Sequence, residues 1–387
     1  MSEFIPLSIP NISGNEWDYV RECLSTGWVS SAGRYVMRFE QDLARYVGAQ
    51  HAVACASGTA ALHTALLLLG ARGGDVVLAP SLTFIAPINA VRYCGAEPVF
   101  FGADRFFNLD PAGAREYLAA ETEQRDGQAF ETRTGRPIRA LLSVAVFGNA
   151  GDWSELYADC RRRGIAILED ATEAMGTRYT AGAWSGRHAG AAADMVCFSF
   201  NGNKIITTGG GGMIATDSDE LARRARYLTQ QAKDDPIAYV HDEIGYNYRL
   251  TNIAAAIGVA QLERIEEFVA IKQANYAAYR ERLAALAWCE LQPAPEYARN
   301  NLWMYALRIR EGRWRDRARA LVDALAAQGV ETRPLWHPSH LQKPYRECRS
   351  FGVAHLPELV ANTINLPCST NLQVPQIDRI CEVLARV

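Results

Sequence analysis

Short apolar runs alternate with stretches of helical periodicity along the first 250 residues of the chain. Apolar runs of this length predict buried strands, and apolar side chains at helix spacing predict helices between them. Strands are expected over residues 52–56, 76–79, 98–101, 140–147, 165–170 and 195–200, and helices over residues 60–69, 85–93, 111–119 and 153–163. This alternation predicts a three-layer α/β/α fold with a mostly parallel sheet, whose ligands collect at the carboxyl ends of the strands.

The pattern changes beyond residue 250. Apolar positions such as Ile253, Ile257 and Ile265 recur at helix spacing, which predicts one long helix over residues 250–286. Strands over residues 303–309 and 330–333 and helices over residues 314–327 and 374–386 predict a smaller α/β unit. We therefore expect a large domain, residues 1–250, followed by a linking helix and a small C-terminal domain, residues 251–387. Two amphipathic helices before residue 48 and an exposed polar loop over residues 122–137 are also expected.

Charge and composition narrow the functional classes. A net charge of −3 gives no polycationic surface, so nucleic acid is not an expected partner. The nine cysteines form no Cys-x-x-Cys pair, and several lie in apolar runs, which is typical of reduced core thiols. The N-terminus lacks the pattern of a signal peptide, and no apolar run reaches membrane-spanning length. We therefore expect a cytoplasmic protein.

Three groups of chemically useful residues follow expected strands. Lys204 stands after the strand over residues 195–200, before a glycine-rich turn, and a desolvated lysine amine can attack a carbonyl. Asp170 ends the strand over residues 165–170. Ser57-Gly58-Thr59 precedes a helix, whose free N–H groups can hold a phosphate. An amine, an acid and a phosphate cradle together match the requirements of pyridoxal phosphate. The structural alternatives are a surface lysine, a capping aspartate and an ordinary helix N-cap.

These residues, with Phe198-Ser199-Phe200 and Gly245 to Arg249, resemble the DegT-like nucleotide-sugar aminotransferases, which are fold type I pyridoxal-phosphate enzymes. The resemblance covers nearly the whole chain. Residues 201–212 and 231–236 narrow it to the subgroup of legionaminic-acid and related pathways. The resemblance implies L-glutamate as amino donor and a UDP- or GDP-linked 4-keto-6-deoxy sugar as acceptor, in surface-polysaccharide or nonulosonic-acid biosynthesis. It also implies a homodimer whose active sites are completed across the interface.

The resemblance further implies roles for single residues. Lys204 would bind the cofactor covalently and move protons, and Asp170 would keep the pyridine nitrogen protonated. Phe84 would stack on the cofactor, and Asn149 stands where many relatives have a glutamine that contacts the phenolic oxygen. The remaining candidates are Ser57, Gly58, Thr59 and Ser199 for the phosphate, Asn247 for the partner subunit's phosphate, and Asn201, Arg249 and His337 for the substrate.

Other interpretations of the site remain. Glu173 fits a capping box better than catalysis. Gly210 stands where most relatives carry glutamate, which removes one carboxylate from the site's edge. His337 and His340 have a spacing that metals use, but they lack a cysteine or carboxylate partner in a known pattern, so no metal site is expected. The rival functions are a pyridoxal-phosphate-dependent sugar dehydratase, which Lys204 disfavours, and a non-catalytic regulatory or scaffold relative, which the intact candidate residues disfavour.

Overall fold

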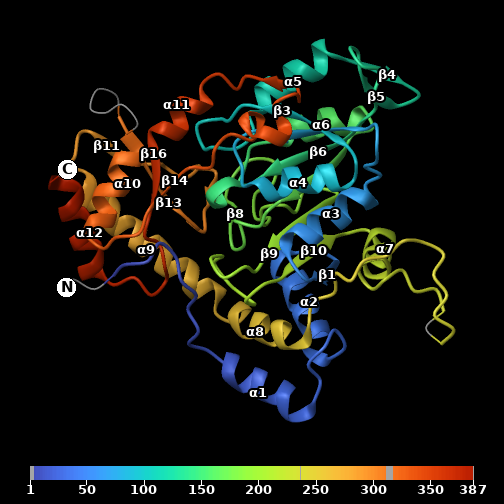
Figure 1. Ribbon diagram of the computed structural model, residues 1–387, viewed down its shortest axis with the longest axis horizontal. Coiled ribbons are helices and arrows are strands. Elements are labelled where there is room, and N and C mark those ends of the chain that lie inside the picture. The colour runs from blue at the N-terminus through green and yellow to red at the C-terminus, as the bar shows by residue number, and fades with distance from the viewer. Residues whose placement is uncertain (1–3, 236, 311–316, 387) are drawn as a thin grey trace.

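The computed structural model of the protein describes residues 4–235, 237–310 and 317–386. Its larger unit is built on an eight-stranded sheet in the order β1-β10-β9-β7-β6-β2-β3-β15 (Figure 1). Strand β10 runs antiparallel to its neighbours β1 and β9, and all other neighbouring pairs are parallel. The strands are β1 (His51–Cys55), β2 (Val76–Pro80), β3 (Glu97–Phe101), β6 (Ile138–Val144), β7 (Ala166–Asp170), β9 (Met195–Ser199), β10 (Gly212–Thr216) and β15 (Ser350–Phe351).

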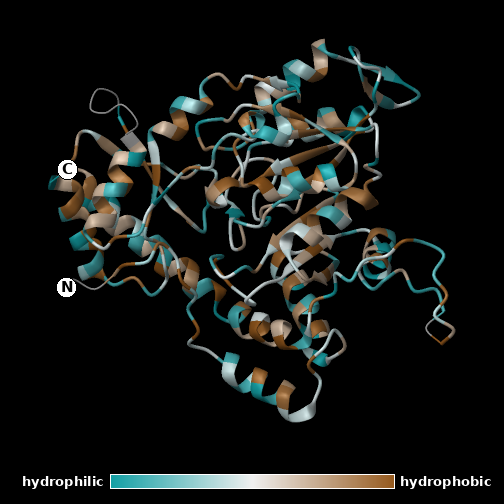
Figure 2. Ribbon diagram, viewed as in Figure 1, coloured by the Kyte–Doolittle hydropathy of each residue, from teal (hydrophilic) through white to brown (hydrophobic). Residues whose placement is uncertain are grey.

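Helices cover both faces of this sheet because its strands are apolar on both sides. Along β2, Val77 and Ala79 join a core cluster on one face, while Val76 and Leu78 join a cluster on the other. Helices α3 (Gly58–Leu68), α4 (Ile85–Tyr93) and α7 (Asp219–Thr229) cover the first face. Helices α2 (Arg34–Val47), α5 (Pro111–Ala120), α6 (Ser154–Arg162) and α8 (Asn252–Leu262) cover the second. Figure 2 shows hydrophobic residues along the strands of the interior. The predicted three-layer α/β/α architecture is confirmed.

The smaller unit has its own four-stranded antiparallel sheet, in the order β11-β13-β16-β14. Its strands are β11 (Cys289–Leu291), β13 (Tyr305–Ile309), β14 (Arg333–Pro334) and β16 (Thr363–Leu366). Helices α9 (Ile265–Leu283), α10 (Arg317–Ala327), α11 (Leu356–Ala361) and α12 (Val374–Arg386) lie around it. Part of the predicted helix over residues 314–327 lies outside the described residues.

Two segments cross the predicted boundary at residue 250. Ile5 forms a parallel bridge with Val330 of the smaller unit, and β15 extends the large sheet beside β3. The short strands β8 (Arg178–Tyr179) and β12 (Ala298–Arg299) also pair across it. The two-domain division therefore stays a prediction, and the structure joins the two units by exchanged segments. The 3₁₀ turns η1 (Val146–Gly148), η2 (Ser339–Leu341) and η3 (Lys343–Tyr345) connect these elements.

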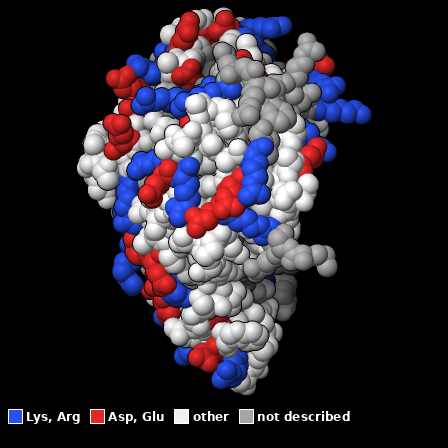
Figure 3. All heavy atoms as spheres, turned by 90° about the vertical axis from the view of Figure 1, so that its left-hand side faces the viewer, with Lys and Arg blue, Asp and Glu red and all other residues white. Residues whose placement is uncertain are grey.

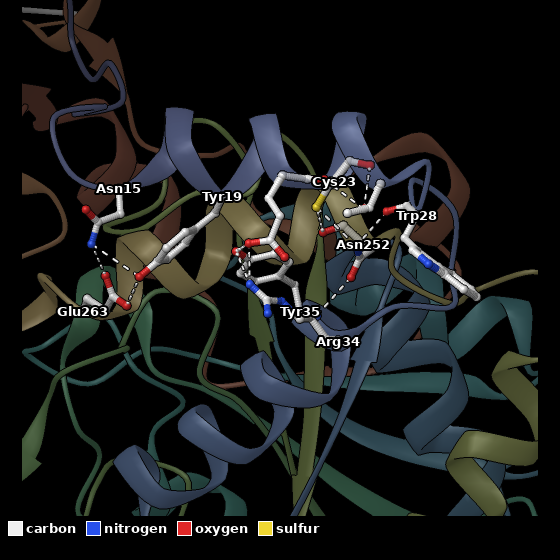
Figure 4. A network of polar contacts seen from close by, with 10 residues as sticks. Asn15, Tyr19, Cys23, Trp28, Arg34, Tyr35, Asn252 and Glu263 are labelled. Carbon is white, nitrogen blue, oxygen red and sulfur yellow. Dashed lines mark hydrogen bonds and ion pairs between the residues drawn. The ribbon is translucent and has the colours of Figure 1, made fainter.

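The expected single helix over residues 250–286 is wrong, because the chain forms α8 and α9 with a break at Glu263 and Arg264. Arg264 leaves helical geometry, with φ −113° and ψ 7°. The Glu263 carboxylate accepts hydrogen bonds of 2.8 Å from both Asn15 and Tyr19 of the segment around α1 (Glu16–Thr26), as Figure 4 shows. At the other end of α8, Asn252 donates to the Trp28 carbonyl and accepts from the Tyr35 N–H. These tertiary contacts fix both ends of α8.

The expected loop over residues 122–137 is also wrong, because it contains a hairpin of β4 (Thr122–Arg125) and β5 (Gln128–Glu131). The connecting residues Asp126 and Gly127 both have positive φ, 49° and 78°. An Asp-Gly pair is a strong hairpin signal, and it could have identified this turn despite the polar strands. Over the described residues, no helix combines the length and apolar character that crossing a membrane requires.

Glu169 lies within the larger unit, one residue before Asp170. It is fully buried, and its Oε2 accepts a 3.0 Å hydrogen bond from the Tyr157 hydroxyl, while Oε1 has no partner among the described residues. Burial raises the pKa of Glu169 from 4.5 to about 7. The folded state therefore keeps this proton over a pH range in which the unfolded chain has lost it.

We expect this group to make the protein less stable as pH rises from about 4.5 to about 7, because the unfolded state then binds fewer protons than the folded state. Glu169→Gln removes the titration. The quantity to follow is the free energy of unfolding of the variant minus that of the unsubstituted protein. Between pH 5 and pH 8 this difference should increase, by on the order of 3 kcal/mol at most. Urea denaturation of both proteins at several pH values measures it. A difference that does not change with pH would contradict the assignment.

Candidate active site

A cavity of about 560 Å³ lies where β1, β2, β6, β7 and β9 end. These strands run in the same direction, so the loops that follow them meet at one edge of the sheet. The smaller unit closes the other side with residues of β14, β16 and the segment before β13. Eight of the predicted site residues line this cavity, namely Ser57, Gly58, Thr59, Phe84, Asp170, Ser199, Asn201 and Lys204.

Lys204 extends into the cavity between an acid and an aromatic ring. Its side chain is 12% exposed, and its Nζ lies 3.5 Å from Oε1 of Glu173 and 4.0 Å from the centre of the Trp303 ring. The carboxylate and the face of the indole both stabilise a positive charge. Burial nevertheless raises the pKa of Glu173 to about 7, with Lys204 opposing the shift. The amine therefore sits beside a carboxyl group that titrates near neutral pH.

Glu173 is a site residue that the sequence analysis assigned to a capping box, and the structure corrects this. The next element after Asp170 is the strand β8, so no helix begins near Glu173 and there is no helix N-terminus for it to cap. Its Oε2 instead accepts a 2.8 Å hydrogen bond from the Phe147 N–H, which leaves Oε1 facing Lys204. The sequence could have identified Glu173 as a site residue, because a residue three positions after the strand-end Asp170 stays close to that aspartate. Trp303 carried no such signal, since it comes from a distant segment.

Asp170 ends β7 and is 3% exposed. Its Oδ1 accepts a 3.0 Å hydrogen bond from the Thr172 N–H. Burial raises the pKa of Asp170, while the Thr172 hydrogen bonds and the charge of Lys204 oppose the shift. A buried carboxyl group with a raised pKa is suited to share a proton with a basic nitrogen placed against it.

The N-terminus of α3 lines the cavity and is its candidate anion-binding part. Ser57 is its N-cap, and its Oγ accepts a 3.1 Å hydrogen bond from the Ala60 N–H. Gly58 and Thr59 occupy the first turn, whose N–H groups have no acceptor within the helix. A Cβ at Gly58 would lie 2.8 Å from Cβ of Ser199, and one at Gly212 would lie 2.4 Å from the Ser57 carbonyl oxygen. Glycine at both positions therefore lets Ser199 lie against the start of α3.

The other four predicted residues do not line the cavity. The Asn149 amide donates to the Phe106 carbonyl and accepts from Asn300 at 2.5 Å, so its hydrogen bonds are structural. Arg249 pairs with Glu40 and donates to the Ala54 carbonyl. Asn247 and His337 are exposed on the described surface. Trp336, next to His337, does line the cavity, and its ring lies 6.4 Å from Phe84.

The arrangement fits pyridoxal phosphate. The cofactor needs an amine for its aldehyde, an acid for its pyridine nitrogen and donors for its phosphate. Lys204, Asp170 and the α3 N-terminus with Ser199 supply these groups around one cavity. Over the described ranges, no group of three or more His, Cys, Asp or Glu side chains is placed to hold a metal ion.

We expect Gly58→Ala to weaken phosphate binding, because the added methyl group would collide with Ser199. Overpacking of this kind costs about 1–3 kcal/mol, which corresponds to roughly a fivefold to hundredfold loss of affinity for pyridoxal phosphate. Equilibrium dialysis of the cofactor-free protein measures it. Gly73→Ala is the matched control, because a Cβ there meets no atom within 4 Å. Unchanged affinity in Gly58→Ala would contradict the proposed cradle.

Comparison with known proteins agrees with this geometry. A family model described as "DegT/DnrJ/EryC1/StrS aminotransferase family" matches residues 10–385. The GDP-perosamine synthase of Caulobacter vibrioides is 39% identical over 99% of this chain and 98% of its own length. That of Escherichia coli O157:H7 is 34% identical over 98% of this chain and 97% of its own length. The crystal structure of DesV of S. venezuelae with a ketimine intermediate is 29% identical, with a TM-score of 0.84, and covers 96% of this chain and 94% of that chain.

The fold type I architecture and the pyridoxal-phosphate-dependent aminotransferase predicted from the sequence are therefore confirmed. The narrower resemblance to the legionaminic-acid subgroup finds no support in these relatives and stays a prediction. From the family model and the two curated relatives together, we conclude that the chain belongs to the DegT/DnrJ/EryC1/StrS aminotransferase family.

Proposed function

We propose that this aminotransferase moves the amino group of L-glutamate to the keto carbon of a nucleotide-linked 4-keto-6-deoxy sugar. The observation that carries the proposal is the position of Lys204, whose amine faces a cavity that also holds a buried acid and an anion cradle. Two relatives that match along nearly the whole chain are named GDP-perosamine synthases, which favours GDP over UDP as the nucleotide. The product would be an amino sugar for a surface polysaccharide.

The residues of the site would have different roles in this reaction. Bound pyridoxal phosphate supplies an electron sink for the carbon that loses its proton. Lys204 would take a proton from that carbon and return it, since its amine is within 3.5 Å of Glu173 and can exchange protons there. Asp170 would hold a proton on the ring nitrogen, and Ser57, Gly58, Thr59 and Ser199 would anchor the phosphate. Phe84 would stack on the cofactor, and Trp336, whose ring lies 6.4 Å from that of Phe84, would give the sugar an apolar wall that limits the entry of water.

The acceptor side favours a sugar nucleotide over a small keto acid. The cavity of about 560 Å³ is lined by three aromatic side chains of different segments beside Phe84, namely Phe147, Trp303 and Trp336. The Phe147 and Trp336 rings lie 5.2 Å apart. Planar rings of this kind pack against the apolar face of a pyranose. No nucleic-acid partner is proposed, because the net charge of −3 gives no polycationic surface; on the face that Figure 3 shows, basic and acidic residues are mixed.

We further propose a cytoplasmic homodimer in which Asn247 of each protomer reaches the partner's cavity. Asn247 is exposed and outside its own cavity. It follows an arm, described over residues 231–235 and 237–245, which projects beyond α7 in Figure 1 and carries Ile237, Tyr239 and Ile244 at 89%, 70% and 84% exposure. Apolar side chains this exposed are typical of a surface that another chain covers.

The transamination is tested by following the absorbance band of the lysine-bound cofactor. L-glutamate should remove the band, and after removal of the donor one of a panel of GDP-, UDP- and dTDP-linked 4-keto-6-deoxy sugars should restore it. Lys204→Ala should lose at least about a thousandfold in turnover, because the group that binds the cofactor and moves the proton is gone. Lys343→Ala, an exposed lysine outside the cavity, is the control. A band that glutamate does not change would contradict glutamate as donor, and full turnover in Lys204→Ala would contradict the whole mechanism.

The homodimer is tested by Ile244→Lys, which places a charge in the proposed interface. We expect the dissociation constant of the dimer to rise by about tenfold or more, because a buried unpaired charge is costly. Sedimentation equilibrium measures it. Val374→Lys introduces the same charge at an exposed apolar residue of α12 and should leave the dimer intact. Dimers of equal stability in both variants would place the interface elsewhere.

A further inference from the structure

The wall of the cavity opposite the sheet edge carries a polar pair that the proposed chemistry has not used. Arg333 and Asn365 both line the cavity, and they are directly opposite each other in the β14–β16 pairing. Residues opposite each other in an antiparallel pair extend to the same face of the sheet. The smaller unit therefore presents a guanidinium and an amide side by side to the cavity.

Arg333 is held in position but keeps hydrogen-bonding capacity. Its Nη2 lies 2.6 Å from Oε1 of Glu331, and its Nη1 donates to the Thr332 carbonyl at 3.1 Å. Glu331 is fixed in turn, because its Oε2 accepts a 3.0 Å hydrogen bond from the Leu7 N–H. A guanidinium has more N–H groups than these two contacts use. The Arg333 side chain is 60% exposed, so a ligand can reach it.

Asn365 provides the second, independent observation. It is 6% exposed, and its Oδ1 is buried without a hydrogen-bond donor among the described residues. A buried acceptor without a partner costs about 1–3 kcal/mol, so such atoms are rare unless a ligand or water satisfies them. Because Asn365 lines the cavity, a rotation of its amide would bring this oxygen to an N–H or O–H group of a ligand on this side.

We infer that Arg333 and Asn365 form a recognition site for a substrate group that combines an anionic oxygen with a neighbouring N–H or O–H donor. This inference rests on the proposed function. Two substrates carry that chemistry: L-glutamate, with a carboxylate beside its ammonium group, and the nucleotide sugar, with a phosphate beside sugar hydroxyls. Arg333 binds the anionic oxygen, and Asn365 accepts from the donor. Both are specificity-determining residues on the smaller unit, apart from the residues that perform the chemistry.

The test measures binding separately from turnover. Holoenzyme is reduced with borohydride, which blocks transamination, and its affinities for L-glutamate, GDP-mannose, UDP-N-acetylglucosamine and dTDP-glucose are measured by calorimetry. Arg333→Gln should weaken the probe that uses the site by at least about tenfold, and Arg333→Lys should recover part of it. Asn365→Leu should weaken the same probe. Arg319→Gln, on the exposed side of α10, removes the same charge without reaching the cavity and should change nothing.

The pattern of losses identifies the substrate. Weaker L-glutamate alone assigns the site to the donor, and a weaker nucleotide sugar alone assigns it to the acceptor. Arg333→Gln affinities that stay within about twofold for every probe that binds the unsubstituted enzyme would overturn the inference while leaving the proposed function standing. An unsubstituted enzyme that binds none of the probes would overturn the proposed function, and this inference with it.

Discussion

The site depends on keeping a lysine amine largely out of water without losing its reactivity. Removing an ammonium group from water is costly unless nearby groups stabilise its charge. Lys204 is stabilised by Glu173 at 3.5 Å and by the face of Trp303 at 4.0 Å. Both partners are fixed by backbone contacts, since Glu173 accepts from the Phe147 N–H and Trp303 donates from its indole to the Asn203 carbonyl at 2.7 Å. The amine is therefore held by three segments that are far apart in the sequence.

A second buried lysine connects this arrangement to the smaller unit. Lys272 of α9 is 3% exposed and donates to the carbonyls of Trp303 at 2.8 Å and Cys368 at 2.5 Å. Burial lowers the pKa of Lys272, and the acceptors that it bonds in the described part of the chain are carbonyl oxygens rather than a carboxylate. It ties α9 to the segment before β13 and to the segment after β16. The ring that covers Lys204 and the strand that carries Asn365 are thus anchored to the same helix.

The sequence predicted the large sheet and most of its chemistry because these depend on local patterns. Apolar runs identified its main strands, and their polar ends identified Lys204, Asp170 and Ser57 to Thr59. The position of Asn149 outside the cavity could not be predicted from the sequence, since its amide accepts a hydrogen bond from Asn300, which only tertiary packing brings near. The break between α8 and α9 was missed for the same reason, because the partners of Glu263 lie about 250 residues earlier. Trp303, Arg333 and Asn365 reach the cavity only through the packing of the two units.

The two walls of the cavity differ in how their positions are set, and this separates chemistry from recognition. Asp170 ends β7 and Lys204 follows the neighbouring central strand β9, and the parallel pairing of these strands sets where the two groups lie. Arg333 and Asn365 belong to a two-residue pairing between β14 and β16, at the edge of a separate sheet. A side chain on that short edge strand can change without shifting the register of the large sheet. Substrate choice can therefore vary on the smaller unit while the lysine, the acid and the anion cradle keep their geometry.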